Sequence, residues 1–331
     1  MFKALLLTQD PDGKTQAAVR DIDEADLPAG EVLVKVRYSA LNYKDALAIT
    51  GRGKIVRHWP MVPGIDFAGT VLSSADSRFE EGDEVMLTGW GVGEDHWGGM
   101  AERARVKADW LCHLPDSLSD RHAMALGTAG LTAMLCVMAL EEGRVMPGNP
   151  HPVVVTGASG GVGSVAVALL AQLGYQVVAV SGRPDNEDYL RGLGAKTVLA
   201  RDSFNGKPRL LDKQIYSGVV DTVGGPILAA LLSQLNYNGV AAACGLAGSV
   251  ELSTSVMPFI LRNVRLQGVD SVICPRPRRQ LAWQRLGEIL PEGIYEQLAL
   301  EIPLDAVPAL ADALLDGKVT GRTLVRVSAE D

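Results

Sequence analysis

The sequence predicts an α/β fold in which a β-rich first domain is followed by a doubly wound parallel sheet. Up to about residue 120, apolar and polar residues alternate in short stretches such as 31–38 (EVLVKVRY), and turn signals are dense. Alternation of this kind is typical of half-buried strands. Short strands between frequent turns indicate a compact, barrel-like β domain.

Beyond residue 120 the pattern changes to alternating helix and strand. The segment 120–140 has a helical composition and is followed by the breakers PGNP at 147–150. Strands are then expected at 153–156, 176–180, 197–199, 218–221 and 239–243, with helices at 164–173, at 187–193 and near 280–290. Strands that alternate with helices imply a parallel sheet covered on both faces. A final strand at 324–327 (LVRV) is placed to return to the first domain.

Composition and charge exclude several classes of protein. The 331 residues are 47% hydrophobic and carry a formal net charge of −8, whereas nucleic-acid binding needs a surplus of Lys and Arg. The N-terminal segment lacks the features of a secretory signal, and the longest apolar stretch, 125–140, is shorter than a membrane span and indicates a buried helix. The 4 cysteines are too far apart for a disulfide framework or a zinc knuckle. We therefore expect a cytoplasmic protein with no nucleic-acid or membrane partner.

The segment VTGASGGVGS (155–164) has the pattern of a dinucleotide-binding turn. In register with G-x-G-x-x-G it reads ASGGVG (158–163), and it follows a predicted strand and opens a predicted helix, which is the context this fingerprint requires. Gly160 would let the backbone approach a pyrophosphate, and Gly163 would let the helix pack close to the strand. The N–H groups at the helix start favour an anion. The alternative is a tight turn with no ligand.

The end of the next strand indicates which nucleotide is bound. An NAD site usually carries Asp or Glu there, whereas this strand ends in Ser181, Gly182 and Arg183. A hydroxyl and a guanidinium bind a 2′-phosphate through charge-assisted hydrogen bonds, and a carboxylate would repel it. We predict NADPH as the cofactor. The alternative is an arginine on a solvated turn.

Several motifs resemble those of the medium-chain dehydrogenase/reductase superfamily. They are PGIDFAG (63–69), EGDEV (81–85), GGMAE (98–102) and the glycine turn. The resemblance implies a GroES-like catalytic domain over residues 1–122, completed by about 271–331. It also implies a Rossmann NADPH-binding domain over residues 123–270.

The zinc ligands of the zinc-dependent members have no counterpart in this sequence. Where those members carry His-Glu in the first motif, this chain has Ile65 and Asp66, and LNYKD (41–45) offers no cysteine. Catalytic zinc needs three protein ligands around an open position, and the 5 histidines form no such cluster in the sequence. We predict an enzyme with no metal, and we interpret Asp66 as a residue that braces a turn.

Longer runs resemble the zinc-free quinone-oxidoreductase-like branch and, within it, the bacterial acrylyl-CoA reductases. The runs include LNYKDALAITG (41–51), LTGWGVGEDHWGGMAE (87–102) and MPFILRNVRLQGVDSV (257–272). The resemblance implies a homodimer, with residues 264–269 on an edge strand, that reduces acrylyl-CoA to propionyl-CoA with NADPH. It implies cofactor contacts at Tyr43, Ser159, Gly160, Gly161, Val162, Ser181, Gly182, Arg183, Arg201, Leu246, Ile260 and Ser271.

Tyr43 is the candidate catalytic residue. Hydride addition to the β-carbon of an unsaturated thioester pushes charge onto the thioester oxygen, which without a metal needs a hydrogen-bond donor. The Tyr43 phenol can donate such a bond, and the alternative is that it only packs against the nicotinamide; Asn42 and Asp45 are weaker candidates. Two basic stretches compete as contacts for the polyanionic coenzyme A: Arg52, Lys54, Arg57 and His58 in the first, and Arg276, Arg278 and Arg279 in the second.

Two other functions remain open from the sequence. A quinone or enone reductase on the same scaffold would act without coenzyme A. A non-enzymatic NADPH sensor or lens-crystallin-like protein would bind the cofactor and reduce nothing.

Overall fold

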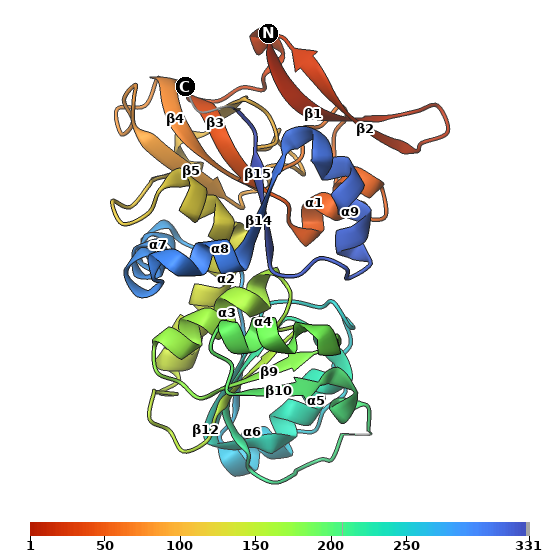
Figure 1. Ribbon diagram of the computed structural model, residues 1–331, viewed down its shortest axis with the longest axis vertical. Coiled ribbons are helices and arrows are strands. Elements are labelled where there is room, and N and C mark those ends of the chain that lie inside the picture. The colour runs from red at the N-terminus through yellow and green to blue at the C-terminus, as the bar shows by residue number, and fades with distance from the viewer. Residues whose placement is uncertain (207, 329–331) are drawn as a thin grey trace. The chain divides into compact units, whose positions relative to one another are not determined.

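The chain divides into two compact units. The computed structural model (Figure 1) describes residues 1–206 and 208–328. Unit 1 comprises Met1–Thr128, Ser271–Gln280 and Leu298–Asp331, and unit 2 comprises Ala129–Asp270 and Leu281–Gln297. The predicted boundaries place 281–297 with the first domain and 123–128 with the second, whereas the structure groups 281–297 with unit 2 and 123–128 with unit 1. Residues 329–331, at the end of the first predicted domain, lie outside the described part.

Unit 1 is built on a mainly antiparallel sheet. In spatial order its strands are β14 (Ala299–Pro303), β15 (Arg322–Arg326), β3 (Val32–Ala40), β4 (Asp66–Ser74), β5 (Glu84–Thr88) and β7 (Leu111–His113), and β6 (Arg103–Val106) also pairs with β3. A separate hairpin joins β1 (Phe2–Gln9) to β2 (Thr15–Ile22). In β15, Val325 lies opposite Ser39 of β3, so the C-terminal strand returns to the first unit as the sequence predicts.

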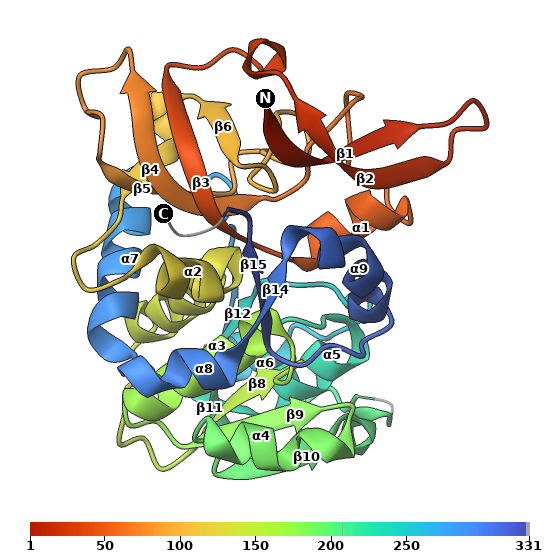
Figure 2. The same cartoon turned by 45° about the horizontal axis from the view of Figure 1, so that its top comes forward.

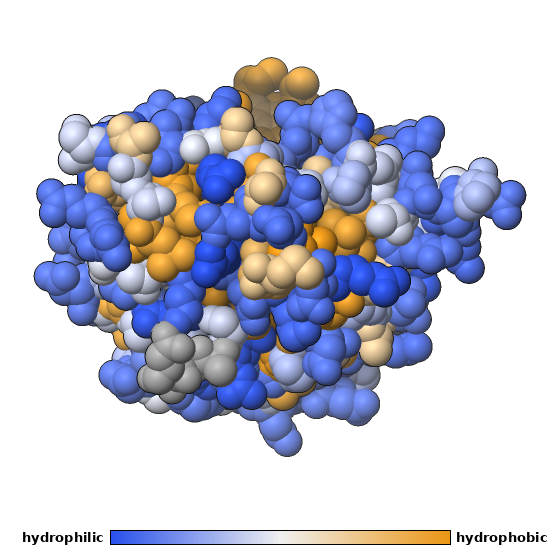
Figure 3. Space-filling model, turned by 90° about the horizontal axis from the view of Figure 1, so that it is seen from above, coloured by the Kyte–Doolittle hydropathy of each residue, from blue (hydrophilic) through white to orange (hydrophobic). Residues whose placement is uncertain are grey.

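The core of unit 1 follows from the apolar positions of these strands. In β3 the side chains of Val32, Val34 and Val36 are buried and pack with Phe67 and Met100. Burial of a side chain of this size contributes on the order of 1.5–3 kcal/mol relative to exposure. Seen from above (Figure 3), hydrophilic side chains cover most of the visible face, with hydrophobic side chains in patches between them.

Two helices of unit 1 were not predicted from the sequence. Helix α1 (Tyr43–Thr50) follows β3, and α9 (Val307–Leu315) lies beside it (Figure 2). Helix α1 ends at Gly51, whose φ of 70° lies in the left-handed region that favours glycine. Tyr43 is thus the first residue of a short helix that follows β3 and packs against α9.

Unit 2 contains the predicted parallel sheet. In spatial order its strands are β10 (Thr197–Ala200), β9 (Val177–Ser181), β8 (Val153–Thr156), β11 (Tyr216–Asp221), β12 (Leu235–Ala243) and β13 (Arg265–Gly268). The chain runs from β8 outward to β10 and then returns to β11 on the other side of β8. This reversal of strand order is the topological switch point, and ligands of open parallel sheets bind at the carboxyl ends of the strands there.

Helices cover both faces of this sheet. Helices α3 (Gly161–Gln172) and α4 (Glu187–Gly192) lie on one face, and α5 (Gly225–Gln234) and α6 (Met257–Arg262) on the other (Figure 1). Right-handed crossovers on either side of a switch point produce this arrangement. Helices α7 (Arg276–Ile289) and α8 (Tyr295–Leu298) follow β13 in the chain.

Helix α2 (Asp120–Glu142) extends beyond the apolar stretch seen in the sequence. By length and composition it could cross a membrane, but 94% of its most apolar window is buried inside the protein. Gly127 interrupts its helical backbone, with φ 54° and ψ −153°. The burial agrees with the interpretation of this segment as a core helix.

Candidate functional site

Close approach of backbone atoms shapes the glycine turn after β8. Helix α3 begins directly after Gly160, which is its N-cap residue. A Cβ atom on Gly163 would lie only 2.3 Å from the Gly157 carbonyl oxygen, so a side chain there would push the helix away from the strand end. Gly157 has a φ of +56°, and a Cβ atom on it would meet Thr222 Oγ1 at 2.2 Å. The first N–H groups of α3 have no partner within the helix and favour an anion at this position.

Hydroxyl and guanidinium groups gather at the carboxyl ends of β8 and β9. The buried hydroxyls of Ser159 and Ser181 lie 3.3 Å apart, and Arg183 Nη2 donates to Ser159 Oγ at 3.3 Å. The backbone N–H of Arg183 donates to Ser181 Oγ at 3.1 Å. A Cβ atom on Gly182 would lie 3.1 Å from the guanidinium carbon of Arg201. The guanidinium groups of Arg183 and Arg201 therefore both lie next to the turn after β9. Such a set of donors fits the 2′-phosphate of NADP.

A buried carboxylate joins the two strands at the switch point. Asp221, at the end of β11, accepts hydrogen bonds from Thr156 Oγ1 of β8 at 2.7 Å and from the Gly224 N–H at 2.8 Å. Burial raises the pKa of the Asp221 carboxyl. Asp221 is not among the residues that the sequence analysis predicts, although an aspartate that ends an apolar strand is the available signal. Its contacts fix the turn against which the glycine loop packs.

Two of the predicted apolar contacts are exposed. Leu246 is 64% exposed and Ile260 is 73% exposed. Leu246 follows the end of β12, where a Cβ atom on Gly224 would approach its Cα atom to 3.7 Å. Single exposed apolar side chains are common on protein surfaces, so their exposure leaves them accessible but does not itself indicate a ligand. Within unit 2, Leu246 therefore lies beside the switch-point turn, while Ile260 lies on α6.

Tyr43 and Ser271 belong to unit 1, and the other predicted cofactor residues belong to unit 2. Tyr43 is the first residue of α1 and is 54% exposed, whereas Ser271 is buried. An exposed phenol at a helix start is available to a bound molecule.

A buried polar cluster fixes the start of α1 below Tyr43. The side-chain amide of Asn42 donates to Asp45 Oδ2 at 3.2 Å and to Asp66 Oδ2 at 2.9 Å. Asp45 also accepts from the backbone N–H groups of Gly64 and Ile65, both at 3.0 Å. Burial, helped by the nearby Asp66 charge, raises the pKa of the Asp45 carboxyl to about 7. Sequence analysis ranks Asn42 and Asp45 below Tyr43 as candidates, whereas in the structure they hold the start of the helix that carries Tyr43.

Asp66 holds separate segments of unit 1 together. Its carboxylate accepts from the Ala40 N–H at 3.2 Å and from the Thr128 N–H at 2.7 Å. Arg322 Nη1 donates to Asn42 Oδ1 at 3.0 Å, and the Arg322 charge opposes the rise that burial causes in the pKa of Asp66. Asp66 therefore has a structural role, but it joins the end of β3 to α2 rather than bracing only the turn that the sequence analysis expects.

The two basic stretches differ in what their side chains contact. Arg52 forms ion pairs with Asp312 at 2.9 Å and Asp316 at 3.0 Å. Arg279 is buried and donates to backbone carbonyls, which removes it from the candidate coenzyme A contacts. Lys54 and Arg57 are exposed and, within the described residues, belong to no recorded ion pair.

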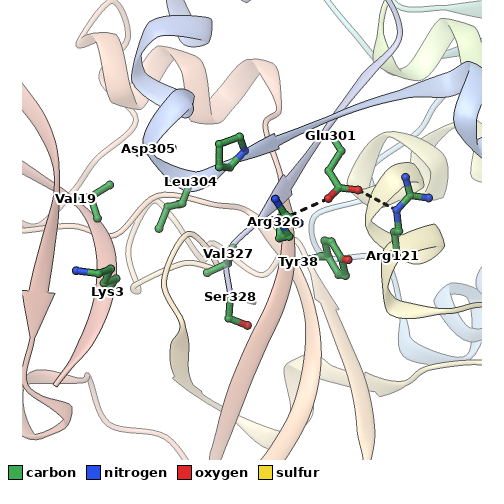
Figure 4. Close-up of a pocket in the computed structure, with 11 residues that line it drawn as sticks. Lys3, Val19, Tyr38, Arg121, Glu301, Leu304, Asp305, Arg326, Val327 and Ser328 are labelled. Carbon is green, nitrogen blue, oxygen red and sulfur yellow. Dashed lines mark hydrogen bonds and ion pairs between the residues drawn. The ribbon is translucent and has the colours of Figure 1, made fainter. Parts of the chain in front are cut away.

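A hollow of about 890 Å³ lies within unit 1, and the predicted site residues do not line it. Figure 4 shows Glu301 between Arg121 and Arg326. Its carboxylate forms ion pairs with Arg121 at 2.9 Å and with Arg326 at 3.7 Å. Glu301 therefore pairs with two of the cations that line this hollow.

Comparison with known proteins settles the family. Residues 28–116 match the family described as "Alcohol dehydrogenase GroES-like domain", and residues 161–285 match "Zinc-binding dehydrogenase". The chain is 61% identical to the probable acrylyl-CoA reductase AcuI of Escherichia coli (strain K12), over 99% of this chain and 100% of that protein. The chain belongs to the medium-chain dehydrogenase/reductase superfamily. The resemblance seen in the motifs is thereby confirmed, as are the GroES-like and Rossmann components of the fold.

Two further members of the medium-chain dehydrogenase/reductase superfamily are similar over their full length. The acrylyl-CoA reductase AcuI of Ruegeria pomeroyi is 52% identical over 99% of this chain and 100% of that protein. The crystal structure of the YhdH oxidoreductase from Salmonella enterica in complex with NADP is 62% identical, with a TM-score of 0.96, and the match covers 98% of this chain and 100% of that one.

The matched family description names zinc, so the possible metal ligands matter for this medium-chain dehydrogenase/reductase. Over residues 1–206 and 208–328, no group of three or more His, Cys, Asp or Glu side chains is placed to hold a metal ion. The positions equivalent to the zinc-binding motif, Ile65 and Asp66, are a buried apolar residue and the bracing carboxylate described above.

Proposed function

We propose that this protein is an NADPH-dependent acrylyl-CoA reductase that converts acrylyl-CoA to propionyl-CoA. The observation that carries the proposal is the full-length identity, 61% and 52%, to two proteins named as acrylyl-CoA reductases. The serine and arginine side chains at the ends of β8 and β9 support NADPH as the electron donor.

The residues of unit 2 would hold the nucleotide by distinct chemistry. The start of α3 takes the pyrophosphate, the Ser181–Arg183 turn and Ser159 take the 2′-phosphate, and Arg201 stacks on or pairs with the adenine end. Leu246 and Ile260 would provide apolar surface, and Tyr43 and Ser271 are the remaining proposed contacts. When bound, NADPH supplies the hydride that adds to the β-carbon of the substrate.

Tyr43 stabilises the charge that develops on the substrate. As the β-carbon is reduced, the electrons of the double bond move toward the thioester oxygen, and the α-carbon then takes up a proton. The Tyr43 hydroxyl donates a hydrogen bond to that oxygen. A donor held in place before the reaction contributes more than one that must reorient, and the hydrogen bonds among Asn42, Asp45 and Asp66 supply this rigidity.

A second contact restrains α1 from the side. Lys44 Nζ binds Glu94 Oε1 at 2.8 Å, and both side chains are partly buried. The backbone carbonyl of Glu94 accepts from the Arg57 N–H at 2.8 Å. The loop that carries Lys54 and Arg57 is therefore connected to the helix that carries Tyr43, and these two cations are the proposed coenzyme A contacts.

The exposed edge strand supports a homodimer. All four residues of β13 are exposed, and within the described residues β13 pairs with β12 on one side only. An unpaired edge of this kind is a template for a strand of another chain, and pairing with the same strand of a second copy forms a closed two-fold assembly.

We also propose that the protein works in the cytoplasm.

The test compares four substrates with NADPH in one absorbance assay: acrylyl-CoA, crotonyl-CoA, free acrylate and a quinone. We expect kcat/KM for acrylyl-CoA to exceed the others by about tenfold or more, a difference of about 1.4 kcal/mol in transition-state binding. Faster turnover of the quinone would replace the proposal with a quinone reductase. Tight NADPH binding with no turnover would identify a binding protein.

A further inference from the structure

Arg279 closes the segment that starts at Ser271 into a loop. The side chain is 2% exposed, and its Nη2 atom donates to the carbonyls of Ser271 at 2.9 Å and Val272 at 3.1 Å. Both bonds point back to the beginning of the segment Ser271–Gln280, which belongs to unit 1 although the chain before and after it belongs to unit 2.

The same guanidinium attaches this loop to the sheet of unit 1. Its Nη1 atom donates to the carbonyl oxygen and to Oγ1 of Thr88, both at 2.6 Å. Thr88 is the last residue of β5. Hydrogen bonds with a charged donor contribute more than neutral ones and are costly to remove when buried. Arg279 thus connects β5 to the first two residues of the loop.

The turn after β5 holds Val272 from the other side. The Trp90 N–H donates to the Val272 carbonyl at 3.1 Å, and a Cβ atom on Gly89 would lie 2.7 Å from that oxygen. The Arg279 guanidinium lies 5.0 Å from the centre of the Trp90 ring, which is within the range of a cation–π contact. The carbonyl of Val272 is therefore bound by two donors from different parts of the chain.

We propose that Arg279 is a positioning residue for NADPH, because it fixes the backbone of Ser271. The proposal rests on the proposed function, which places Ser271 against the cofactor. Arg279 does not touch the cofactor in this account and acts through Ser271. Lysine cannot replace it, because a single ammonium group cannot reproduce a planar fork that reaches three carbonyls and a hydroxyl.

The test uses Arg279→Lys with Arg285→Lys as its matched control. Arg285 lies on the same helix and binds Glu141 at 2.6 and 2.8 Å, so its replacement also removes part-buried hydrogen bonds of a guanidinium. The dissociation constant of NADPH is measured by fluorescence titration, and KM for acrylyl-CoA is measured in parallel. We expect R279K to weaken NADPH binding by about fivefold or more with KM for acrylyl-CoA changed less than about twofold, and R285K to leave both unchanged.

An Arg279→Lys enzyme with a lower Tm but wild-type NADPH affinity would overturn the proposal, because it would show a purely structural role. If R279K does not fold, Thr88→Val replaces it as the test variant, because it removes only the Oγ1 acceptor of Arg279. We expect Thr88→Val to weaken NADPH binding by about twofold. Unchanged NADPH affinity in this variant would refute the proposal. A wild-type protein that binds NADPH but does not reduce acrylyl-CoA would end the proposed function and leave the role of Arg279 intact.

Discussion

Arg183 Nη2 lies 3.3 Å from the hydroxyl oxygen of Ser159, so the side chain after β9 reaches back to the loop after β8. In a site for NAD a carboxylate usually stands at the end of β9, but here that position is Ser181, whose hydroxyl lies 3.3 Å from Ser159. The contact brings a positive charge to two hydroxyls at the position where a 2′-phosphate is expected.

Replacing Arg183 should remove the preference for NADPH. A charge-assisted hydrogen bond contributes about 1.5–3 kcal/mol, so we expect Arg183→Ala to lower kcat/KM for NADPH by roughly 10- to 100-fold. Steady-state kinetics with NADPH and NADH check this, and kcat/KM for NADH should stay within about twofold. Arg191→Ala, which removes an exposed pair with Glu187, is the control. Equal losses with both nucleotides would contradict the assignment.

The hydroxyl of Tyr43 should matter for turnover more than for binding. We expect Tyr43→Phe to lower kcat by about tenfold or more, about 1.4 kcal/mol of transition-state stabilisation, with little change in KM for NADPH. The exposed Tyr237 gives the control variant Tyr237→Phe. Wild-type turnover in Tyr43→Phe would leave only the packing role for this ring.

The buried aspartates predict how stability depends on pH. The pKa of Asp45 is raised from 3.8 to about 7, so between these values the folded protein keeps a proton that the unfolded chain has lost. The free energy of unfolding therefore falls as pH rises from about 4 to about 7 and levels off above that. Urea denaturation at several pH values should show a shallower slope for Asp45→Asn, which has no carboxyl to titrate there.

The control for that experiment is Asp21→Asn, because Asp21 is exposed and paired with Lys3. Asp45→Asn should also lower the free energy of unfolding by about 1–3 kcal/mol, since an amide nitrogen in place of Oδ2 cannot accept from the backbone and side-chain N–H groups of Asn42. Identical pH slopes in wild type and Asp45→Asn would show that Asp45 stays ionised.

A side chain at Gly163 should displace the start of α3. Its Cβ atom would lie 2.3 Å from the Gly157 oxygen, and overpacking of this kind costs about 1–3 kcal/mol. We expect Gly163→Ala to lower Tm and to weaken NADPH binding, as measured by thermal unfolding and by titration. Gly293→Ala places its Cβ atom in open space and should change neither quantity. Wild-type NADPH affinity in Gly163→Ala would show that the position of the start of α3 does not matter for cofactor binding.

Reversal of charge tests the coenzyme A contacts. Lys54→Glu combined with Arg57→Glu should raise KM for acrylyl-CoA by about tenfold, because surface attraction to a polyanion is lost, while KM for NADPH stays unchanged. The effect should shrink at high salt, where exposed charges are screened. An unchanged KM for acrylyl-CoA would exclude this stretch.

Most strands of unit 2 could be predicted because local pattern decides them, whereas helices α5 and α6 are not among the predicted elements. The expected strand 153–156 is β8 itself, and the expected helix 187–193 ends one residue earlier, at Gly192. Helix α1 was missed because it has only 8 residues and follows a strand directly. Asn42 followed three residues later by Asp45 is a helix-start signal that could have indicated it.

The cluster around Asp66 and the role of Arg279 could not be predicted from local pattern. The contact between Arg322 and Asn42 spans 280 positions in the sequence, and that between Arg279 and Thr88 spans 191. In the sequence, Arg279 belongs to a run of arginines that indicates an exposed basic surface. Only the packing of β5 against the loop Ser271–Gln280 shows that this charge is buried.

The transfer of labelled hydride tests the central claim most directly. The protein is given acrylyl-CoA and NADPH that carries deuterium on the transferable position of the nicotinamide, and the product is identified by mass spectrometry and NMR. The account predicts propionyl-CoA with one deuterium on the β-carbon, formed in a one-to-one ratio with oxidised cofactor. Cofactor oxidation without labelled propionyl-CoA, or label on the α-carbon, would contradict it.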